Sequence, residues 1–274
     1  MFSVVIPVFN HEAYVVEAAY SALRSAQVSE VLLVDDGSAD ASARLISQLA
    51  AQHPDRVRNL TPIADGNRGA HYRLNQLVDE ARQDWIAVLN SDDAFVSGRF
   101  ELLARWLQGS DASFAFGHLV ITDKHGTPVG TKRGIAQPEY PFPRGFREAE
   151  RARRGELAEL LANQNFIATT SNLVFKKSLA QKIGGFSDFR YVHDWDFALR
   201  ASLQAEGLYV PHFLSLYRDH DGNTIKASQE IVRHEVQDMF RSLVRDFPEL
   251  LNRAGLPEAL AGNTYLAGEP WLGA

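Results

Sequence analysis

The 274-residue sequence contains no cysteine, which excludes disulfide frameworks, zinc fingers, iron–sulfur ligation and thiol nucleophiles. Positive charge is also scarce: 28 lysines and arginines face 34 aspartates and glutamates, giving a net charge of −6. Nucleic acid is therefore not an expected partner, because its binding depends on a cationic surface. No apolar run is as long as a membrane span. The first residues include no basic segment, so we expect no secretory signal. The composition predicts a cytoplasmic protein in a reducing compartment.

Apolar runs and helical patterns alternate in the first half of the chain. The runs are rich in β-branched residues, which favour buried strands, and the segments between them carry apolar residues at helical spacing. This alternation predicts right-handed crossovers and a largely parallel sheet flanked by helices, which is the α/β class with a Rossmann-like arrangement. The expected strands are 2–9, 30–34, 57–60 and 85–89, and the expected helices are 12–26, 39–52 and 70–81.

The second half of the chain is less regular. We expect a hairpin that turns at His125 and Gly126, a proline-containing loop over 137–146, and a strand at 172–175. An almost unbroken apolar stripe from Ile231 to Val244 predicts an amphipathic helix that packs either on its own domain or on a partner, as in a homodimer. The remaining expected helices are 147–163, 179–183 and 194–206.

Polar side chains follow three of the predicted strands at their carboxyl ends, where open parallel sheets bind ligands. These are Asn10, the pair Asp35 and Asp36, and the segment 90–93. The edge carries no glycine-rich phosphate loop, and carboxylates repel phosphate directly. They can hold it through Mg²⁺ or Mn²⁺, and a carboxylate can also accept hydrogen bonds from a base or a ribose. The pattern therefore predicts a nucleoside-diphosphate ligand.

Each acidic segment also has a purely structural interpretation. Asp35 to Ser38 is compatible with a turn followed by a helix N-cap, and Asn90 to Asp93 with a polar loop that caps the next helix. The placement of both segments at strand ends of one sheet favours the functional interpretation over either segment taken alone.

Several segments together resemble the family 2 glycosyltransferases, which have the GT-A fold. The resemblance covers residues 1–224 and implies a catalytic domain there, with a nucleotide-sugar-binding half (1–110), an acceptor-binding half (111–224) and a C-terminal helical extension (225–274). The matching segments are Val4 to Asn10, Val34 to Ser38, Asn67 to Gly69 with Asn75, Leu89 to Asp93, Ile183 to Phe186 and His193 to Arg200, followed by Tyr217 to His220.

The resemblance implies a metal-dependent, inverting glycosyltransferase of the hexosyltransferase type. It would move a sugar from a nucleoside-diphosphate-sugar to a saccharide or lipid-linked saccharide in bacterial cell-surface polysaccharide or glycoconjugate synthesis. A UDP-sugar is the expected donor, with dTDP and GDP left open. Asp194 would be the general base, and the metal, Mn²⁺ or Mg²⁺, would bind chiefly Asp93, with Asp92 and His220. The expected nucleotide-binding residues are Pro7, Phe9, Asp35, Asp36, Asn67 and Asp92.

Two positions depart from the family pattern, because Asn90 and His193 stand where acids are common. We interpret both as tuning of the site, and the alternative is a nucleotide-sugar-binding module with an impaired catalytic site. A phosphatase with a strand-end aspartate nucleophile is disfavoured, because the adjacent Asp35 and Asp36 would point to opposite sides. A nucleotidyltransferase is disfavoured because its glycine-rich basic loop is missing after Phe9.

A cluster of arginines follows the proline-containing segment. It is interspersed with glutamates, so a solvated helix face explains it, and gripping a diphosphate or an anionic lipid surface is the functional alternative. The second interpretation predicts peripheral contact with the inner face of the membrane. The cluster consists of Arg144, Arg147, Arg151, Arg153 and Arg154.

Overall fold

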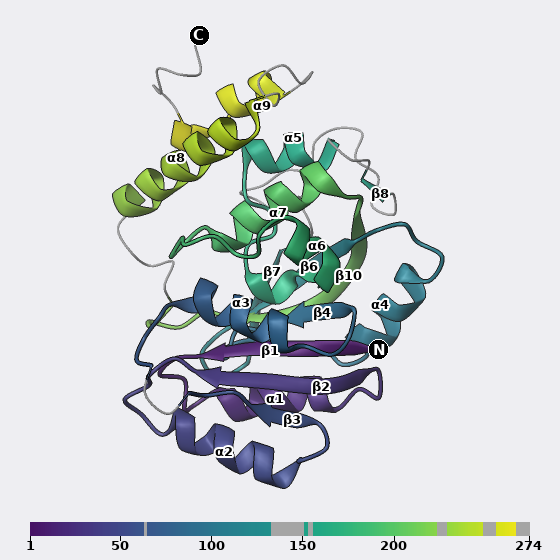
Figure 1. Ribbon diagram of the computed structural model, residues 1–274, viewed down its shortest axis with the longest axis vertical. Helices are drawn as coiled ribbons and strands as arrows, with labels where there is room; N and C mark the ends of the chain where they lie inside the picture. Colours follow the sequence, from purple (N-terminus) through teal and green to yellow (C-terminus); the bar gives the residue numbers. More distant parts are fainter. Residues whose placement is uncertain (63–64, 133–150, 153–155, 224–228, 249–255, 267–274) are drawn as a thin grey trace.

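The computed structural model describes residues 1–62, 65–132, 151–152, 156–223, 229–248 and 256–266 (Figure 1). Within them lies one sheet with the strand order β3-β2-β1-β4-β9-β6-β10-β5, to which β7 and β8 add by pairing with β6 and β10. The strands are β1 Phe2–Val8, β2 Val28–Asp35, β3 Val57–Asn59, β4 Trp85–Val88, β5 Ala94–Phe95, β6 Phe114–Thr122, β7 Pro128–Lys132, β8 Arg151–Ala152, β9 Val174–Lys176 and β10 Gly207–Arg218.

The sequence predicted a largely parallel sheet, which holds for its first half only. β1 pairs in parallel with β2 and β4, and β2 with β3, so the predicted crossovers are confirmed. β9 is antiparallel to both β4 and β6, while β10 is parallel to β6, so the second half of the sheet is mixed. The carboxyl ends of β1, β2 and β4 meet at one edge, as expected.

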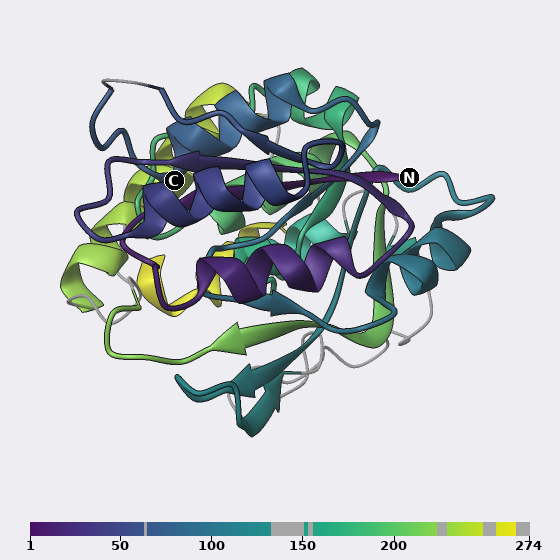
Figure 2. The same cartoon turned by 90° about the horizontal axis from the view of Figure 1, so that it is seen from below.

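Helices cover both faces of the sheet. Along β1, Val4 and Ile6 pack with α1, α2 and α4, whereas Val5 between them packs with α3 and α5 to α8. Figure 2 shows α1 and α2 side by side on the first of these faces. Burial on both faces explains why the strands are continuous apolar runs. The helices are α1 Val15–Leu23, α2 Ser42–Gln52, α3 Ala70–Glu80, α4 Arg99–Leu107, α5 Glu156–Asn163, α6 Lys177–Lys182, α7 His193–Gln204, α8 Gln229–Asp246 and α9 Leu256–Ala261.

The sequence patterns missed α4 and the long strand β10. β10 contains Pro211, and its register with β6 shifts between Val210 and Phe213. Proline lacks the N–H that a strand ladder requires, so it is tolerated at such an irregularity but hides the strand pattern. The helix expected over 147–163 is wrong at 151–152, which form β8. The other arginines of the cluster and the loop at 137–146 lie outside the described residues.

The apolar stripe of α8 faces the core of its own chain. Val236, Met239 and Phe240 are fully buried, and the Phe240 ring meets Trp195 of α7 edge-on at 5.7 Å between centroids. Ile231, at the start of the stripe, is 52% exposed. The helix therefore packs on its own domain, which was one of the two expected outcomes, and a homodimer stays a prediction. In the described ranges, no helix has the length and apolarity needed to cross a bilayer.

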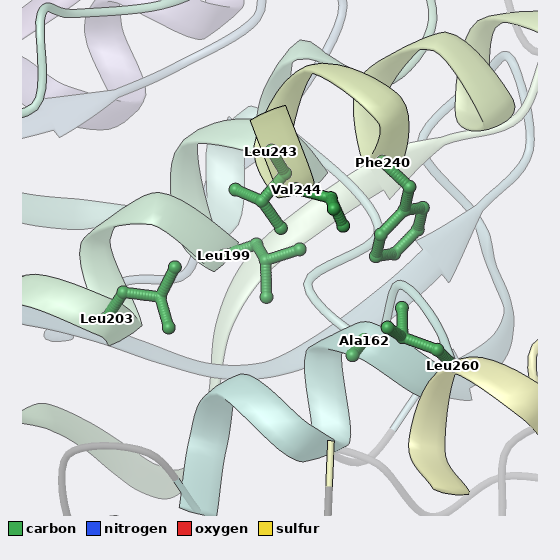
Figure 3. A pocket seen from close by; sticks show the side chains of 7 residues that line it. All are labelled: Ala162, Leu199, Leu203, Phe240, Leu243, Val244 and Leu260. Atoms are coloured by element: carbon green, nitrogen blue, oxygen red, sulfur yellow. The ribbon is translucent and has the colours of Figure 1, made fainter. Parts of the chain in front are cut away.

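A small cavity separates the C-terminal helices from α5 and α7 (Figure 3). Its volume is about 10 Å³, which corresponds to a single water, and its lining is wholly apolar. It is too small for a nucleotide and lacks polar groups to orient one. The lining residues are Ala162, Leu199, Leu203, Phe240, Leu243, Val244 and Leu260.

Phe240→Ala tests how strongly α8 is attached. Truncation of this buried ring should lower the free energy of unfolding by about 3–5 kcal/mol, because it enlarges a cavity that cannot collapse fully. Urea unfolding followed by circular dichroism measures the change. Ile231→Ala on the exposed turn of α8 is the matched control and should change stability by less than about 0.5 kcal/mol. Equal midpoints for Phe240→Ala and the wild type would show that α8 does not contribute to the core.

Candidate functional site

The loops after β1 and β2 are joined by hydrogen bonds at the carboxyl edge of the sheet. The Asn10 amide N–H donates to Ser38 Oγ at 2.8 Å, and the Ala39 N–H donates back to Asn10 Oδ1 at 2.8 Å. Asn10 has φ 54°, a left-handed conformation that asparagine tolerates better than most residues. The next residue, His11, donates its amide N–H to Ser42 Oγ of α2 at 3.0 Å. These bonds fix the position of the His11 side chain at the edge.

Three potential metal ligands meet at this edge: His11, Asp92 and His220. Their ligand atoms all lie within 4.8 Å of one another. His220 Nε2 is 3.1 Å and His11 Nε2 is 3.8 Å from the same atom, Asp92 Oδ2. Asp92 lies in the loop after β4, and His220 follows β10. Asp92 and His220 were both predicted as metal residues, and the structure brings them together.

Neighbouring groups orient both rings. Gly222 N–H lies 3.1 Å from His220 Nδ1, and His220 Nε2 lies 3.1 Å from Asp92 Oδ2, so this ring turns its Nε2 toward the carboxylate. His11 Nδ1 lies 2.7 Å from the hydroxyl of Ser91, which is 2% exposed. Burial lowers the pKa of His11, despite the opposing charge of Asp92. The His11 ring is therefore neutral near pH 7 and able to offer a nitrogen lone pair.

Asp93 faces the interior instead of joining the two histidines. It is 1% exposed, and its carboxylate accepts hydrogen bonds from Ser171 Oγ at 2.6 Å, Thr169 Oγ1 at 3.3 Å and the Arg218 amide at 2.9 Å. Burial, followed by the negative charge of Asp92, raises its pKa to about 7. The residue expected to be the principal metal ligand therefore ties the Asp92 loop to the rest of the site.

Asn90 is hydrogen-bonded to the same segment before β9, residues 169–171. Its side-chain NH₂ donates to Thr169 Oγ1 at 2.9 Å, and its Oδ1 accepts from Thr170 Oγ1 at 2.6 Å. Its backbone N–H donates to Ser171 Oγ at 2.9 Å. The amide at this position therefore holds the segment before β9 against the Asp92 loop.

Arg218, at the end of β10, clamps the Asp92 loop from the other side. Its Nε donates to the Asp92 carbonyl at 2.8 Å, and its Nη2 pairs with Glu17 of α1 at 2.8 Å. The guanidinium carbon lies 4.9 Å above the centre of the Tyr14 ring. Only 4% of the side chain is exposed. A rigid setting of this kind holds the Asp92 carboxylate and the His220 loop in place.

The adjacent residues Asp35 and Asp36 have different surroundings. Asp36 accepts from the amides of Arg68 and Gly69, each at 2.8 Å, and pairs with the buried Arg73 at 2.7 Å. Its carboxylate thus holds the loop before α3. Asp35 Oδ2 accepts from two turn amides, whereas its Oδ1 is buried without a partner among the described residues. An unpaired buried oxygen is costly unless a ligand supplies the missing donor.

The other residues expected to bind the nucleotide lie at the same edge. Phe9 follows β1 and is 44% exposed, which is unusual for a phenylalanine, and Pro7 before it is half-buried. Asn67 is exposed on the loop that Asp36 holds. Gly37, at φ 80°, lets this loop approach closely, because a Cβ there would lie 3.1 Å from the Asn67 amide nitrogen.

Asp194 lies at the start of α7 and is 6% exposed. Its Oδ1 accepts from the Trp195 amide at 2.7 Å and from Asn165 Nδ2 at 3.3 Å. Burial raises the pKa of its carboxyl, while the charges of His193 and Lys132 oppose that shift. A carboxylate with a raised pKa is a stronger base, which suits proton abstraction.

Tyr217 lies within the electrostatic influence of acids from several segments. Burial and then the charges of Asp93, Asp92, Asp219 and Asp194 raise its pKa above the usual range. The acid at the start of α7 and the acids after β4 therefore act on the same phenol group.

Sequence reasoning missed His11, because no ligand spacing surrounds it in the chain. Its partners are separated from it by 80 positions for Ser91 and by more for His220. The only available signal was its place directly after a predicted strand end. Arg218 was missed for a related reason, since its strand was not recognised.

Comparison with known proteins bears on the family and the fold of the chain. The model of "Glycosyl transferase family 2" matches residues 3–184. Among curated relatives, glycosyltransferase GlyG of Streptococcus pneumoniae is 33% identical over 45% of this chain and 40% of its own length. Succinoglycan biosynthesis protein ExoO of Rhizobium meliloti is 33% identical over 56% of this chain and 39% of its own. The chain spans well under two thirds of the length of these relatives.

Solved structures give the same fold. S. aureus TarS 1–349 superposes with a TM-score of 0.67 at 15% identity, over 97% of this chain and 73% of that one. Mannosyltransferase PcManGT of Pyrobaculum calidifontis, solved with GDP-Man and Mn²⁺, gives 0.57 at 17% identity, over 99% and 77%. The GT-A fold expected from the sequence is therefore confirmed. Since the family model matches more than half of the residues, the chain belongs to glycosyl transferase family 2.

Proposed function

We propose that the chain is an inverting glycosyltransferase that moves a sugar from a nucleoside-diphosphate-sugar to a hydroxyl acceptor. The observation that carries the proposal is the meeting of His11, Asp92 and His220 within 4.8 Å at the edge where β1, β2 and β4 end. Ligands of open α/β sheets bind at that edge. A cation held by this cluster would offset the charge of the acidic edge and allow it to bind a diphosphate.

Asp35 and Phe9 form the nucleoside end of the site in this proposal. The unpaired Oδ1 of Asp35 accepts an N–H of the base, and the exposed Phe9 ring offers an apolar face to it. Pro7 and Asn67 line the same end. Asp36 supports the site by fixing the loop that carries Asn67, because its own oxygens already accept three hydrogen bonds.

The residues present fit a divalent cation. Asp92 supplies a carboxylate oxygen, which suits Mn²⁺ or Mg²⁺, and His220 supplies an imidazole nitrogen, which suits a transition ion. Asp93 holds the loop that carries Asp92. When bound, the cation acts as a Lewis acid that offsets the charge developing on the departing diphosphate. PcManGT was solved with Mn²⁺, which supports a metal at this fold.

Asp194 is the general base of the proposed reaction. The acceptor oxygen forms a bond to the anomeric carbon while the bond from that carbon to the diphosphate oxygen breaks, which inverts the configuration. The acceptor proton passes to Asp194 Oδ2, because Oδ1 is held by Trp195 and Asn165. The nucleoside diphosphate leaves with the electron pair of the broken bond.

A UDP-sugar is the proposed donor, and a saccharide or lipid-linked saccharide the proposed acceptor. TarS was solved with UDP and with UDP-GlcNAc, and PcManGT with GDP-Man, so the fold accepts more than one nucleotide. The name of ExoO supports a role in polysaccharide synthesis. Contact with the inner face of the membrane, through the arginines near 150, is part of the same proposal.

Binding of nucleoside diphosphates tests the function directly. Thermal unfolding is recorded with UDP, GDP or dTDP, each with and without Mn²⁺, for the wild type and Asp35→Asn. One nucleotide should stabilise the wild type only with Mn²⁺, by about 2.7 kcal/mol at 100 times its Kd. Asp35→Asn should weaken binding, since its single amide oxygen cannot both accept the Gly37 and Ser38 amides and accept an N–H of the base. Stabilisation by none of the three would contradict the proposal, whereas metal-dependent binding without donor turnover would favour the binding-module alternative.

A further inference from the structure

The side-chain cluster around Asp92 contains a ligand that the sequence pattern did not indicate. His11 comes from the loop after β1, and its Nε2 lies 3.8 Å from Asp92 Oδ2, too far for a hydrogen bond. A cation between the two atoms would have room for bonds of about 2 Å to each, the usual length for a nitrogen or oxygen ligand. The side chain is 23% exposed, so the cation could reach it from solvent.

Ser91 and α2 hold the His11 ring in the orientation that a ligand needs. The ring Nδ1 lies 2.7 Å from the buried Ser91 hydroxyl, and the His11 amide is bonded to Ser42. Metal-binding histidines usually donate their second ring nitrogen to such a group, which fixes the tautomer and directs the other nitrogen to the metal. The ring also packs edge-on against His220, at 5.8 Å between centroids.

Asn90 does not compete for this role. Both polar atoms of its amide are hydrogen-bonded to Thr169 and Thr170. It would reach a cation only by breaking these bonds to the segment before β9. Asp93 is likewise bonded to Ser171 and to the Arg218 amide. The side chains whose ligand atoms meet Asp92 within 4.8 Å in the described part of the chain are the two imidazoles.

We propose that His11 is a direct ligand of the metal, and that the set His11, Asp92 and His220 selects Mn²⁺ or another transition ion over Mg²⁺. The inference rests on the proposed function for its metal but concerns this chain's own ligand set. Imidazole nitrogen suits transition ions, whereas Mg²⁺ prefers oxygen ligands and keeps its waters. A site with two imidazoles and one carboxylate therefore discriminates between transition ions and Mg²⁺, whereas a site with two carboxylates would not.

Electron paramagnetic resonance of Mn²⁺ tests the proposal without any turnover. The free Mn²⁺ signal gives the Kd, and spin-echo modulation reports ¹⁴N nuclei bonded to the ion. The wild type should show two imidazole couplings, and His11→Ala one, with Mn²⁺ binding at least about tenfold weaker. Mg²⁺ should displace Mn²⁺ only at a large molar excess. Ser91→Ala should leave two couplings but weaken binding less than His11→Ala.

His71→Ala is the matched control, because His71 also faces a carboxylate, Asp188 at 3.2 Å, outside the cluster. It should bind Mn²⁺ like the wild type. Unchanged Mn²⁺ affinity and unchanged couplings in His11→Ala would overturn the inference, even if UDP or GDP binding upheld the proposed function. Two ¹⁴N couplings in a protein that binds none of the nucleotides would instead uphold the ligand set and overturn the proposed function.

Discussion

Asp92→Asn should lower the rate of donor cleavage by about a thousandfold, since a bound cation contributes several kcal/mol and each 1.36 kcal/mol is a factor of ten. The two histidines converge on Asp92 Oδ2, so this oxygen is the centre of the cluster. An amide keeps the size of the side chain but removes the charge that attracts the cation. The measurement is nucleoside-diphosphate release in Mn²⁺ from the UDP- or GDP-sugar whose nucleotide the binding panel selects.

Asp221→Asn is the control for charge alone. Asp221 is exposed and lies next to His220, so its substitution removes a nearby negative charge while keeping all three side chains of the cluster. It should lower the rate of donor cleavage by less than about threefold, since exposed charges are largely screened in salt. If Asp92→Asn and Asp221→Asn behaved alike, the acidic edge would act only through its overall charge and not through a bound cation.

Asp194→Asn should lower kcat by about 10²- to 10⁴-fold, the usual contribution of a positioned general base, and leave the donor KM unchanged. The amide can still accept the Trp195 N–H at the start of α7, so the fold should be preserved. Nucleotide-induced thermal stabilisation should equal that of the wild type, because Asp194 is assigned to the acceptor. A parallel loss of donor affinity would place Asp194 in nucleotide binding instead.

The pH dependence of the same pair of proteins gives a second readout. Burial raises the pKa of Asp194, and a base works only when it is deprotonated. The kcat of the wild type should therefore fall as pH falls through this raised pKa, whereas the residual kcat of Asp194→Asn should lack that acidic limb. Asp188→Asn, at a side chain that is 90% exposed, should retain the profile of the wild type.

Local patterns predicted the parallel half of the sheet well, because β1, β2 and β4 are buried on both faces and therefore appear as apolar runs. They failed at β10, where Pro211 and a register shift interrupt the run. They also failed at β8, whose two residues pair with β10 inside a segment expected to be helical. Pairing with a distant strand overrode local preference there.

Candidate acids could be found from the sequence, but their roles could not be separated. Asp35 and Asp36 look alike in the chain, as do Asp92 and Asp93. The fold buries Asp36 against Arg73 and Asp93 against Ser171. It leaves Asp35 Oδ1 without a partner among the described residues and Asp92 beside two histidines. The distinction depends on which distant groups approach each carboxylate.

The sequence by itself determined the parallel arrangement of β1 to β4 and that acids gather where these strands end, because hydrophobic burial and crossover handedness act through local patterns. Only the tertiary structure decided which of these acids faces the ligand edge. It alone brought His220 to Asp92, across 128 positions, and set His11 beside both. The amino-acid sequence states which side chains are present, but the distance between two ligands depends on how all the intervening elements pack.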